Sequence, residues 1–276
     1  MRLIFSLAML IALGFGGWWT WDNVPEVREF VLEKIQKGEF RTLEIRFTAE
    51  QIMGSHQKAL LKGDRYSYNA PELTFYPYLL MEVKYPIDQY TTAEGVLLWG
   101  LTDGEMVINA KSWERTHGYE DCLLASADQH DFNLIRSLVR AGGRVDRDRL
   151  YRTFNVECDI VDGWLDSCQK KKLIVLSGNQ YRLHFSNPKF EIQPQTAIDE
   201  PLVTHSARLA QKVKKRYSPA QIKKLCNLAF GKDFAIRNMS EVFLPVYSIG
   251  VQNPDGSTLT TFWNALNGRQ ITELPL

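Results

Sequence analysis

The chain has 276 residues, enough for two or three small domains. Apolar residues make up 45% and charged residues 24%, an ordinary globular composition that argues against an intrinsically disordered or collagen-like chain. Because 33 Lys and Arg stand against 32 Asp and Glu, no global field attracts nucleic acid, so any nucleic-acid site must be local. Cys122, Cys158, Cys168 and Cys226 form no Cys-x-x-Cys pair, which disfavours structural zinc and predicts buried small side chains.

The first segment of the chain has the character of a membrane anchor. Residues 3–21 carry no charge, and as a helix they would extend about 28 Å, close to the ~30 Å hydrocarbon core of a bilayer. Trp18, Trp19 and Trp21 gather at its end, where aromatic rings favour the headgroup level. We expect residues 1–21 to be a membrane anchor. A cleaved signal peptide and a buried helix are the alternatives.

The side of the membrane is less directly indicated. Only Arg2 precedes the apolar segment, whereas Arg28, Lys34, Lys37 and Arg41 follow it, and this asymmetry opposes export. Large following domains often translocate regardless of such charges, however, and a short basic N-terminal flank is signal-like. We therefore expect the soluble part to be exported, with the cytoplasmic side as the alternative.

Two segments of the chain resemble each other, which predicts two related α+β units at residues 22–125 and 203–276. Each copy places a hydroxyl residue, Thr48 or Ser218, at the N-cap of a short helix. Each then continues with strand-like runs that open at a proline and with a hairpin dipeptide, Asp-Gly or Asn-Gly. The matched segments are Phe47–Ile52 with Tyr217–Ile222, Phe75–Tyr78 with Phe243–Tyr247, and Trp99–Val107 with Trp263–Ile271. Amphipathic helices are expected before them, at 24–37 and 203–216.

This order of one helix followed by strands resembles PepSY-like domains. The resemblance implies a small antiparallel sheet backed by a helix, and a binding or inhibitory role in the bacterial envelope. Two unrelated α+β units are the alternative to a duplication.

The middle of the chain, residues 126–187, contains the most specific pattern. Apolar spacing predicts a helix at 132–140, a second helix capped by Asp146 and a third at about 157–171. Residues 173–185 then form a hairpin around a turn that contains Gly178. Three helices and a terminal hairpin, at about 131–185, resemble the winged-helix domain. A proline-containing linker at 188–202 follows.

The third helix of this module exposes acidic residues. A winged helix usually presents its third helix to the DNA major groove, but phosphates repel carboxylates. We therefore predict protein contacts there, through Asp159, Asp162, Trp164 and Asp166. Trp164 has an alternative place, partly buried against the wing.

Basic residues follow in two groups that are candidates for phosphate or lipid contacts. The first comprises Lys170, Lys171 and Lys172, and the second Lys214, Lys215 and Arg216. Solvated helix faces are the alternative reading of both groups.

Evidence for catalysis is weak, because the chain contains none of the common nucleophile, phosphate-loop, dinucleotide or zinc-protease motifs. His117 and Cys122 lie in the only cluster of candidate ligands, whose spacing fits no standard zinc pattern. We expect no catalytic residue, cofactor or metal. The sequence thus favours a membrane-anchored, non-catalytic scaffold that binds an unknown protein. Its alternatives are a membrane-tethered winged-helix transcription regulator and an uncharacterised enzyme or metal site near His117 and Cys122.

Overall fold

The computed structural model describes residues 38–272, apart from residues 89, 186–187, 191, 200 and 209. The expected anchor at 1–21 and the expected helix at 24–37 lie outside the described residues. Within the described part, no helix combines the length and the apolarity needed to cross a bilayer. By internal contacts the chain divides into two units, residues 1–40 with 204–210, and residues 41–203 with 211–276. In the smaller unit, the Ala207 N–H donates to the Gly38 carbonyl, and the Phe40 ring lies 5.5 Å from that of His205.

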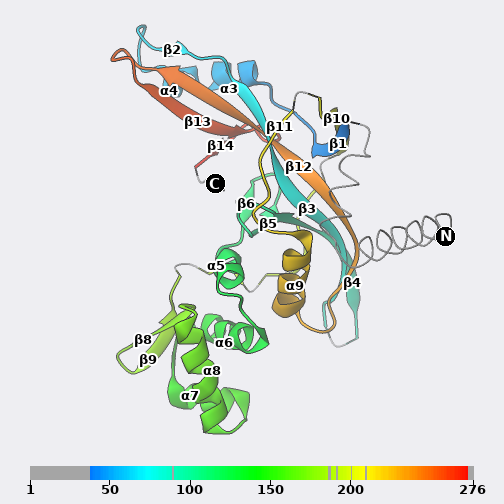
Figure 1. Cartoon of the computed structure of the whole chain (residues 1–276), viewed down its shortest axis with the longest axis vertical. Helices are drawn as coiled ribbons and strands as arrows, with labels where there is room; N and C mark the ends of the chain where they lie inside the picture. Colours follow the sequence, from blue (N-terminus) through cyan, green and yellow to red (C-terminus); the bar gives the residue numbers. More distant parts are fainter. Residues whose placement is uncertain are drawn as a thin grey trace, which may run out of the picture. The chain divides into compact units, whose positions relative to one another are not determined.

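The described chain has a mixed α+β fold, as expected, with an 11-stranded mixed sheet and a separate three-stranded sheet (Figure 1). The large sheet has the order β10-β1-β12-β3-β4-β5-β6, with β11 beside β3, β2 and β13 beside β12, and β14 beside β13. Its strands are β1 Glu39–Leu43, β2 Ser67–Tyr68, β3 Glu72–Pro86, β4 Thr92–Gly100, β5 Met106–Asn109, β6 Glu114–Arg115, β10 Leu202–Ser206, β11 Gln211–Lys212, β12 Ala235–Gln252, β13 Thr258–Asn264 and β14 Gln270–Ile271.

The two segments that resemble each other in sequence share one sheet instead of forming two separate small sheets. Their longest strands, β3 and β12, pair antiparallel over most of their length. Phe243 lies opposite Pro77, and Phe75 lies opposite Pro245. Both prolines were expected at strand entries and lie well inside their strands instead. Proline lacks an N–H but keeps its carbonyl, and here the carbonyls of Pro77 and Pro245 each accept a backbone hydrogen bond, from Leu101 and Ala265 respectively.

Matched residues of the two segments make matched backbone contacts. Thr42 of β1 pairs parallel with Phe243 of β12, and Lys212 of β11 pairs parallel with Phe75 of β3. The turns that follow β1 and β11 are held in the same way, since in each a single carbonyl accepts hydrogen bonds from two successive N–H groups. These bonds run from Arg46 and Phe47 to Ala265, and from Arg216 and Tyr217 to Leu101.

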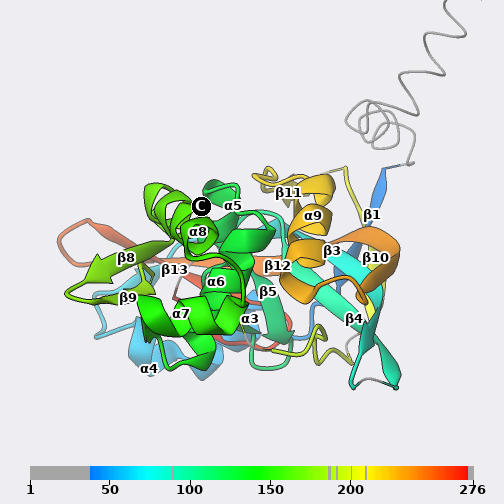
Figure 2. The same cartoon turned by 90° about the horizontal axis from the view of Figure 1, so that it is seen from below.

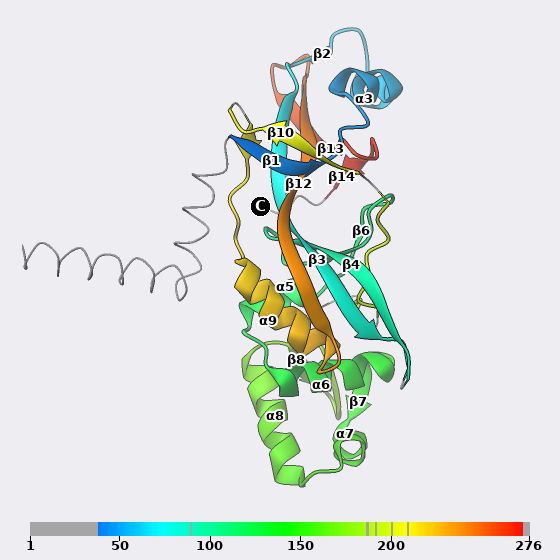
Figure 3. The same ribbon diagram turned by 90° about the vertical axis from the view of Figure 1, so that its right-hand side faces the viewer.

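The helices that follow also match. α3 (Ala49–Ser55) and α9 (Pro219–Phe230) each begin at the expected N-cap hydroxyl, Thr48 or Ser218, and in both the cap is part of a capping box. α9 packs on β3 and β4, where Ile222 shares a core with Trp99, and it lies along this part of the sheet in Figure 3. α3 and the short α4 (Gln57–Leu60) pack on β12 and β13, where Ile52 shares a core with Trp263.

The expected helix at 203–216 is wrong, because this stretch contains β10 and β11. Val203 and Thr204 are β-branched and favour extended backbone, and the apolar stripe available to a helix is thin. Gln211 and Lys212 instead extend the sheet beside β3, and the Val213 N–H donates to the Phe75 carbonyl at 2.9 Å. Tertiary pairing thus overrides the local helical pattern.

The middle module contains the three expected helices and the expected hairpin (Figure 2). After α5 (Tyr119–Leu124), its elements are α6 Gln129–Arg140, β7 Arg144–Asp146, α7 Arg147–Phe154, α8 Cys158–Lys170, β8 Ile174–Ser177 and β9 Gln180–Leu183. Sequence patterns did not predict β7, which pairs with β9 and completes the three-stranded sheet. Leu134, Leu150 and Leu165 are fully buried and belong to the same core cluster as Trp99 and Ile222.

The expected linker at 188–202 is extended, but it packs along the sheet. The Thr196 hydroxyl accepts from the Leu98 N–H at 2.9 Å and donates to the Val107 carbonyl at 2.6 Å. Ala197 forms a parallel bridge with Asn109, and Phe190 is buried. This connector therefore belongs to the folded structure of the larger unit.

Candidate functional site

The exposed side of α8 carries only part of the expected acidic surface. Asp159 and Asp166 are exposed. Asp162 is directed towards α7, because its carboxylate accepts from the Tyr151 hydroxyl at 2.7 Å and lies 3.4 Å from the Arg147 Nε. The hydrogen bond to Asp162 raises the pKa of Tyr151 to about 12. Asp162 therefore links two helices, and of the three predicted aspartates only Asp159 and Asp166 are exposed.

Trp164 is partly buried, as one reading of the sequence expected, and its two ring contacts are with α6 and α7. Its ring stacks on His130 of α6, with centroids 4.4 Å apart, and meets Phe154 of α7 edge-on at 5.5 Å. These contacts give Trp164 a packing role among the three helices. Its predicted partner contact can involve only the part of the ring that remains accessible.

Apolar side chains lie beside the exposed carboxylates. Val156 and Ile160 are 40% and 44% exposed, although both are large aliphatic residues. Asp159, Gly163 and Asp166 follow helical spacing along the exposed side of α8, and a Cβ added at Gly163 would meet no atom within 4 Å. We call this surface, formed by Val156, Asp159, Ile160, Gly163 and Asp166, the α8 face.

The first basic group is divided by the fold. Lys170 and Lys172 are exposed, whereas the Lys171 ammonium lies 2.9 Å from Asp128 and 2.5 Å from the buried Asp131. Burial alone would raise the pKa of Asp128, but hydrogen bonds from Lys171 and from backbone N–H groups outweigh it and lower this pKa. Lys171 therefore neutralises two carboxylates of α6 and its cap, and only Lys170 and Lys172 present exposed ammonium groups.

The second basic group is similarly engaged, and it lies on the segment that leads into α9 instead of on a helix. Lys215 pairs with Glu241 at 2.6 Å, and Arg216 pairs with Glu120 at 2.6 Å. Lys214 is exposed. The expected helix is therefore wrong for this group, but its three side chains are all exposed, and their phosphate or lipid contact stays a prediction.

His117 and Cys122 have opposite environments, since His117 is exposed and Cys122 is buried. Burial raises the pKa of the Cys122 thiol well above its usual range, so the thiol is held in its protonated form. No group of three or more His, Cys, Asp or Glu residues among those described is arranged to hold a metal ion. Cys168 and Cys226 are also buried, as expected, but Cys158 is exposed.

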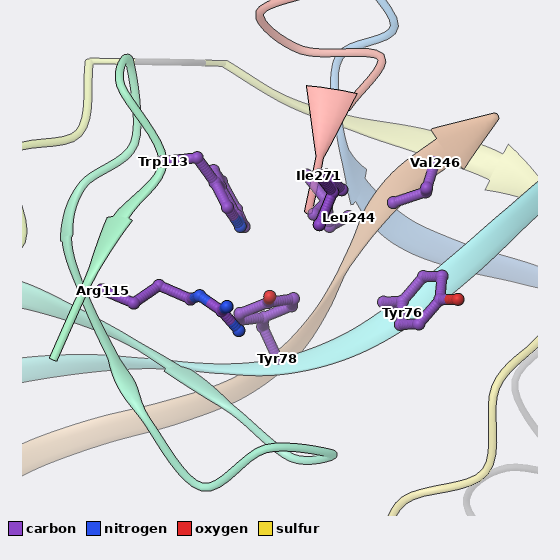
Figure 4. Close-up of a pocket in the computed structure, with 7 residues that line it drawn as sticks. All are labelled: Tyr76, Tyr78, Trp113, Arg115, Leu244, Val246 and Ile271. Atoms are coloured by element: carbon purple, nitrogen blue, oxygen red, sulfur yellow. The ribbon is translucent and has the colours of Figure 1, made fainter. Parts of the chain in front are cut away.

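A cleft that sequence reasoning missed lies beside the hairpin of β13 and β14. Its volume is about 230 Å³, and its lining includes Trp113, Arg115, Asn264, Arg269 and Gln270. A smaller apolar pocket of about 10 Å³, the size of one water molecule, adjoins it and shares Trp113, Arg115 and Ile271 (Figure 4). Figure 4 shows Trp113 and Arg115 on one side of this pocket and Leu244 and Ile271 on the other.

Asn264 is the unusual residue of the cleft, because it is 1% exposed and only half satisfied. Its Oδ1 accepts from the Leu266 N–H at 2.9 Å, which fixes the orientation of the amide. Its Nδ2 has no hydrogen-bond acceptor among the described residues. Burying a donor without an acceptor costs about 1–3 kcal/mol, so this amide favours any group that supplies an oxygen.

Comparison with protein-family models, with curated proteins and with solved structures finds no match for this chain.

Proposed function

We propose that this chain is a membrane-anchored, non-catalytic protein that binds another protein through the α8 face. The observation that carries the proposal is the exposure of Val156 and Ile160 beside Asp159 and Asp166. Exposed aliphatic residues bordered by charges are typical of protein contact surfaces. The complementary partner surface would place Lys or Arg side chains around an apolar contact.

The order α6-β7-α7-α8-β8-β9 supports the resemblance to a winged-helix module. In DNA-binding members of this class the third helix enters the major groove, which carries about one negative charge per 1.7 Å of duplex. Asp159 and Asp166 lie on the corresponding exposed side of α8. Their charge opposes such docking and favours a protein ligand.

The matched backbone contacts of the two α+β segments support an internal duplication. In the proposed protein, the duplicated sheet acts as a scaffold for the middle module, since Arg136 of α6 donates to the Leu228 carbonyl of α9 at 3.0 Å. The apolar segment at 3–21 would tether this scaffold to a membrane, with the soluble part exported.

The test is affinity capture from a membrane extract with the full chain in detergent. We expect a specific protein partner that binds the wild type and is lost in the Asp159→Lys/Asp166→Lys variant. Asp64→Lys/Glu72→Lys is the matched control, because it makes the same charge change at exposed residues outside the middle module. Equal recovery by both variants, or no specific partner at all, would overturn the proposal.

A second candidate, a membrane-tethered transcription regulator, is favoured by the exposed Lys170 and Lys172 at the end of α8. It predicts a gel shift with duplex DNA that Lys170→Glu/Lys172→Glu abolishes. Lys171 is left unchanged in this variant because its replacement would leave Asp131 without its cation. Absence of binding even at low salt would eliminate this candidate.

A further inference from the structure

The β4–β5 hairpin of the first copy and the β13–β14 hairpin of the second match in sequence but have different surroundings. In the first copy, the outer edge of β5 is covered by the chain itself through β6. The Thr116 N–H donates to the Met106 carbonyl at 2.8 Å, and the Thr116 hydroxyl accepts from the Met106 N–H at 2.8 Å. Both edge groups of Met106 are thus satisfied.

The covering segment also presents hydrogen-bond donors to a buried carboxylate. Glu105 accepts from the Gly118 N–H at 2.8 Å, from the Glu120 N–H at 3.0 Å and from the Thr116 hydroxyl at 2.5 Å. In the first copy, therefore, the hairpin supplies the acceptor and the added strand supplies the donors.

In the second copy, Gln270 takes the place of Met106. The Asn264 N–H donates to the Arg269 carbonyl, and the next pair along the ladder is Trp263 opposite Gln270. Hydrogen-bonded and non-hydrogen-bonded pairs alternate in an antiparallel ladder, so the N–H and C=O of Gln270 face away from β13. Within the described residues, β14 pairs with β13 alone, and the 230 Å³ cleft borders the hairpin.

The polarity of the second hairpin is reversed relative to the first. Arg269 stands at the position of Glu105, and the buried Asn264, with its unpartnered Nδ2, stands at the position of Gly100. Arg115 also lines the cleft and lies 2.5 Å from Asp103. The second hairpin therefore presents donors where the first presents an acceptor, and the lining holds no acidic residue.

We propose that the outer edge of β14 binds an extended segment of a partner protein by strand addition, with an Asp or Glu side chain of that segment directed to Arg269 and the Asn264 Nδ2. Exposed sheet edges accept such strands through main-chain hydrogen bonds, and adjoining pockets select the side chains. Trp113 forms a wall of the cleft against which the segment packs. This site is separate from the α8 face and does not depend on it.

The test uses the full chain in detergent and a phage-displayed library of random peptides. We expect the selected peptides to share an acidic residue flanked by strand-forming residues, and their affinity to fall at least tenfold in Arg269→Glu and in Gln270→Pro. Arg269→Lys should retain most binding, as should Arg65→Glu, an equal charge change at an exposed loop residue. Circular dichroism of each variant reports folding independently, and Arg269→Glu remains the decisive variant if Gln270→Pro fails to fold.

Three outcomes would overturn the proposal. They are selection of no peptide above background, selection of peptides that lack an acidic residue, and selected peptides that bind Arg269→Glu as tightly as the wild type. Peptide binding that appears only after removal of residues 273–276 would instead assign the site to the chain's own end. Asp159→Lys/Asp166→Lys should leave peptide binding unchanged, so failure at this site and failure of the α8 face are distinguishable.

Discussion

Replacing Lys171 with Met should destabilise the middle module by about 2–3 kcal/mol. The substitution keeps an unbranched side chain that is one atom shorter and removes its charge, which leaves the Asp131 carboxylate without a cation. Removing one partner of a fully buried ion pair costs about 3–5 kcal/mol. The Asp131 side chain is 2% exposed but that of Lys171 is 24% exposed, so we expect a value below that range.

A double-mutant cycle provides the sharper test. In the wild type the Asp128 N–H donates to the Asp131 carboxylate at 2.9 Å. Asp131→Asn keeps an oxygen that can accept this capping-box hydrogen bond but removes the buried charge. Once that charge is gone, Lys171→Met should cost little more, and the two effects should be strongly non-additive. Urea unfolding followed by circular dichroism gives each free energy. Additive effects, or a cost of Lys171→Met under about 0.5 kcal/mol, would refute the reasoning.

The same cluster sets a pH dependence. The pKa of Asp128 is lowered in the folded chain, so its contribution is present above the unfolded value of 3.8 and is lost as the pH falls through the lowered value. Burial lowers the pKa of Lys171, but hydrogen bonds to Asp128 and Asp131 outweigh it and raise this pKa above 10.5. The lysine contribution is therefore present below pH 10.5 and is lost as the pH rises through the raised value. Lys171→Met should flatten the stability profile at both ends.

Three further predictions concern the larger unit. Glu105→Ala should lower the free energy of unfolding by about 3 kcal/mol or more, because it leaves three donors without their acceptor. Glu105→Gln keeps an acceptor oxygen and should lower it by about 1 kcal/mol. Equal losses for the two variants in urea unfolding would contradict this. Gly104→Ala should destabilise the fold by at least about 1 kcal/mol, because φ is +69° and the new Cβ would lie 2.6 Å from Leu123. Gly54→Ala should instead stabilise it by about 0.5–1 kcal/mol, because Gly54 lies in α3 and a Cβ there would meet no atom within 4 Å. Thermal melts should therefore show a lower melting temperature for the first variant and a higher one for the second. In the native chain, a thiol reagent should label Cys158 rapidly and the three buried cysteines only on unfolding. Mass spectrometry of the labelled peptides measures this, and rapid labelling of a buried cysteine would contradict the prediction.

Local patterns predicted the helices of the middle module and the two N-cap hydroxyls, because apolar spacing and cap chemistry are properties of short segments. Thr48 and Ser218 illustrate this, since each cap bond spans only three residues. The helix expected at 203–216 failed for the opposite reason. Gln211 and Lys212 gain their hydrogen bonds from β3, more than a hundred positions away in the chain, and no local pattern contains that information.

The same distinction explains what was found of the candidate sites. Helical spacing correctly placed Asp159 and Asp166 on the exposed side of α8, but it could not show that Asp162 meets Arg147 or that Lys171 meets Asp131. The cleft beside β14 depends on which strand covers an edge, a feature that only the assembled sheet shows. A signal was nevertheless present, because the aligned hairpins differ in charge at Glu105 and Arg269.

That difference in charge fits the proposed difference in role between the two hairpins, one covered by the chain itself and one left to a partner. The cores of the two segments are matched, since Ile52 shares a core with Trp263 and Ile222 shares one with Trp99, because a closely packed interior tolerates few alternatives. A hairpin edge has no such constraint. When the chain covers the edge itself, as β6 does in the first copy, a buried acceptor such as Glu105 is fully satisfied and stabilises the fold. When the edge is left to another ligand, the same position can carry Arg269, and the unmet donor of Asn264 becomes a source of binding free energy instead of a cost to folding.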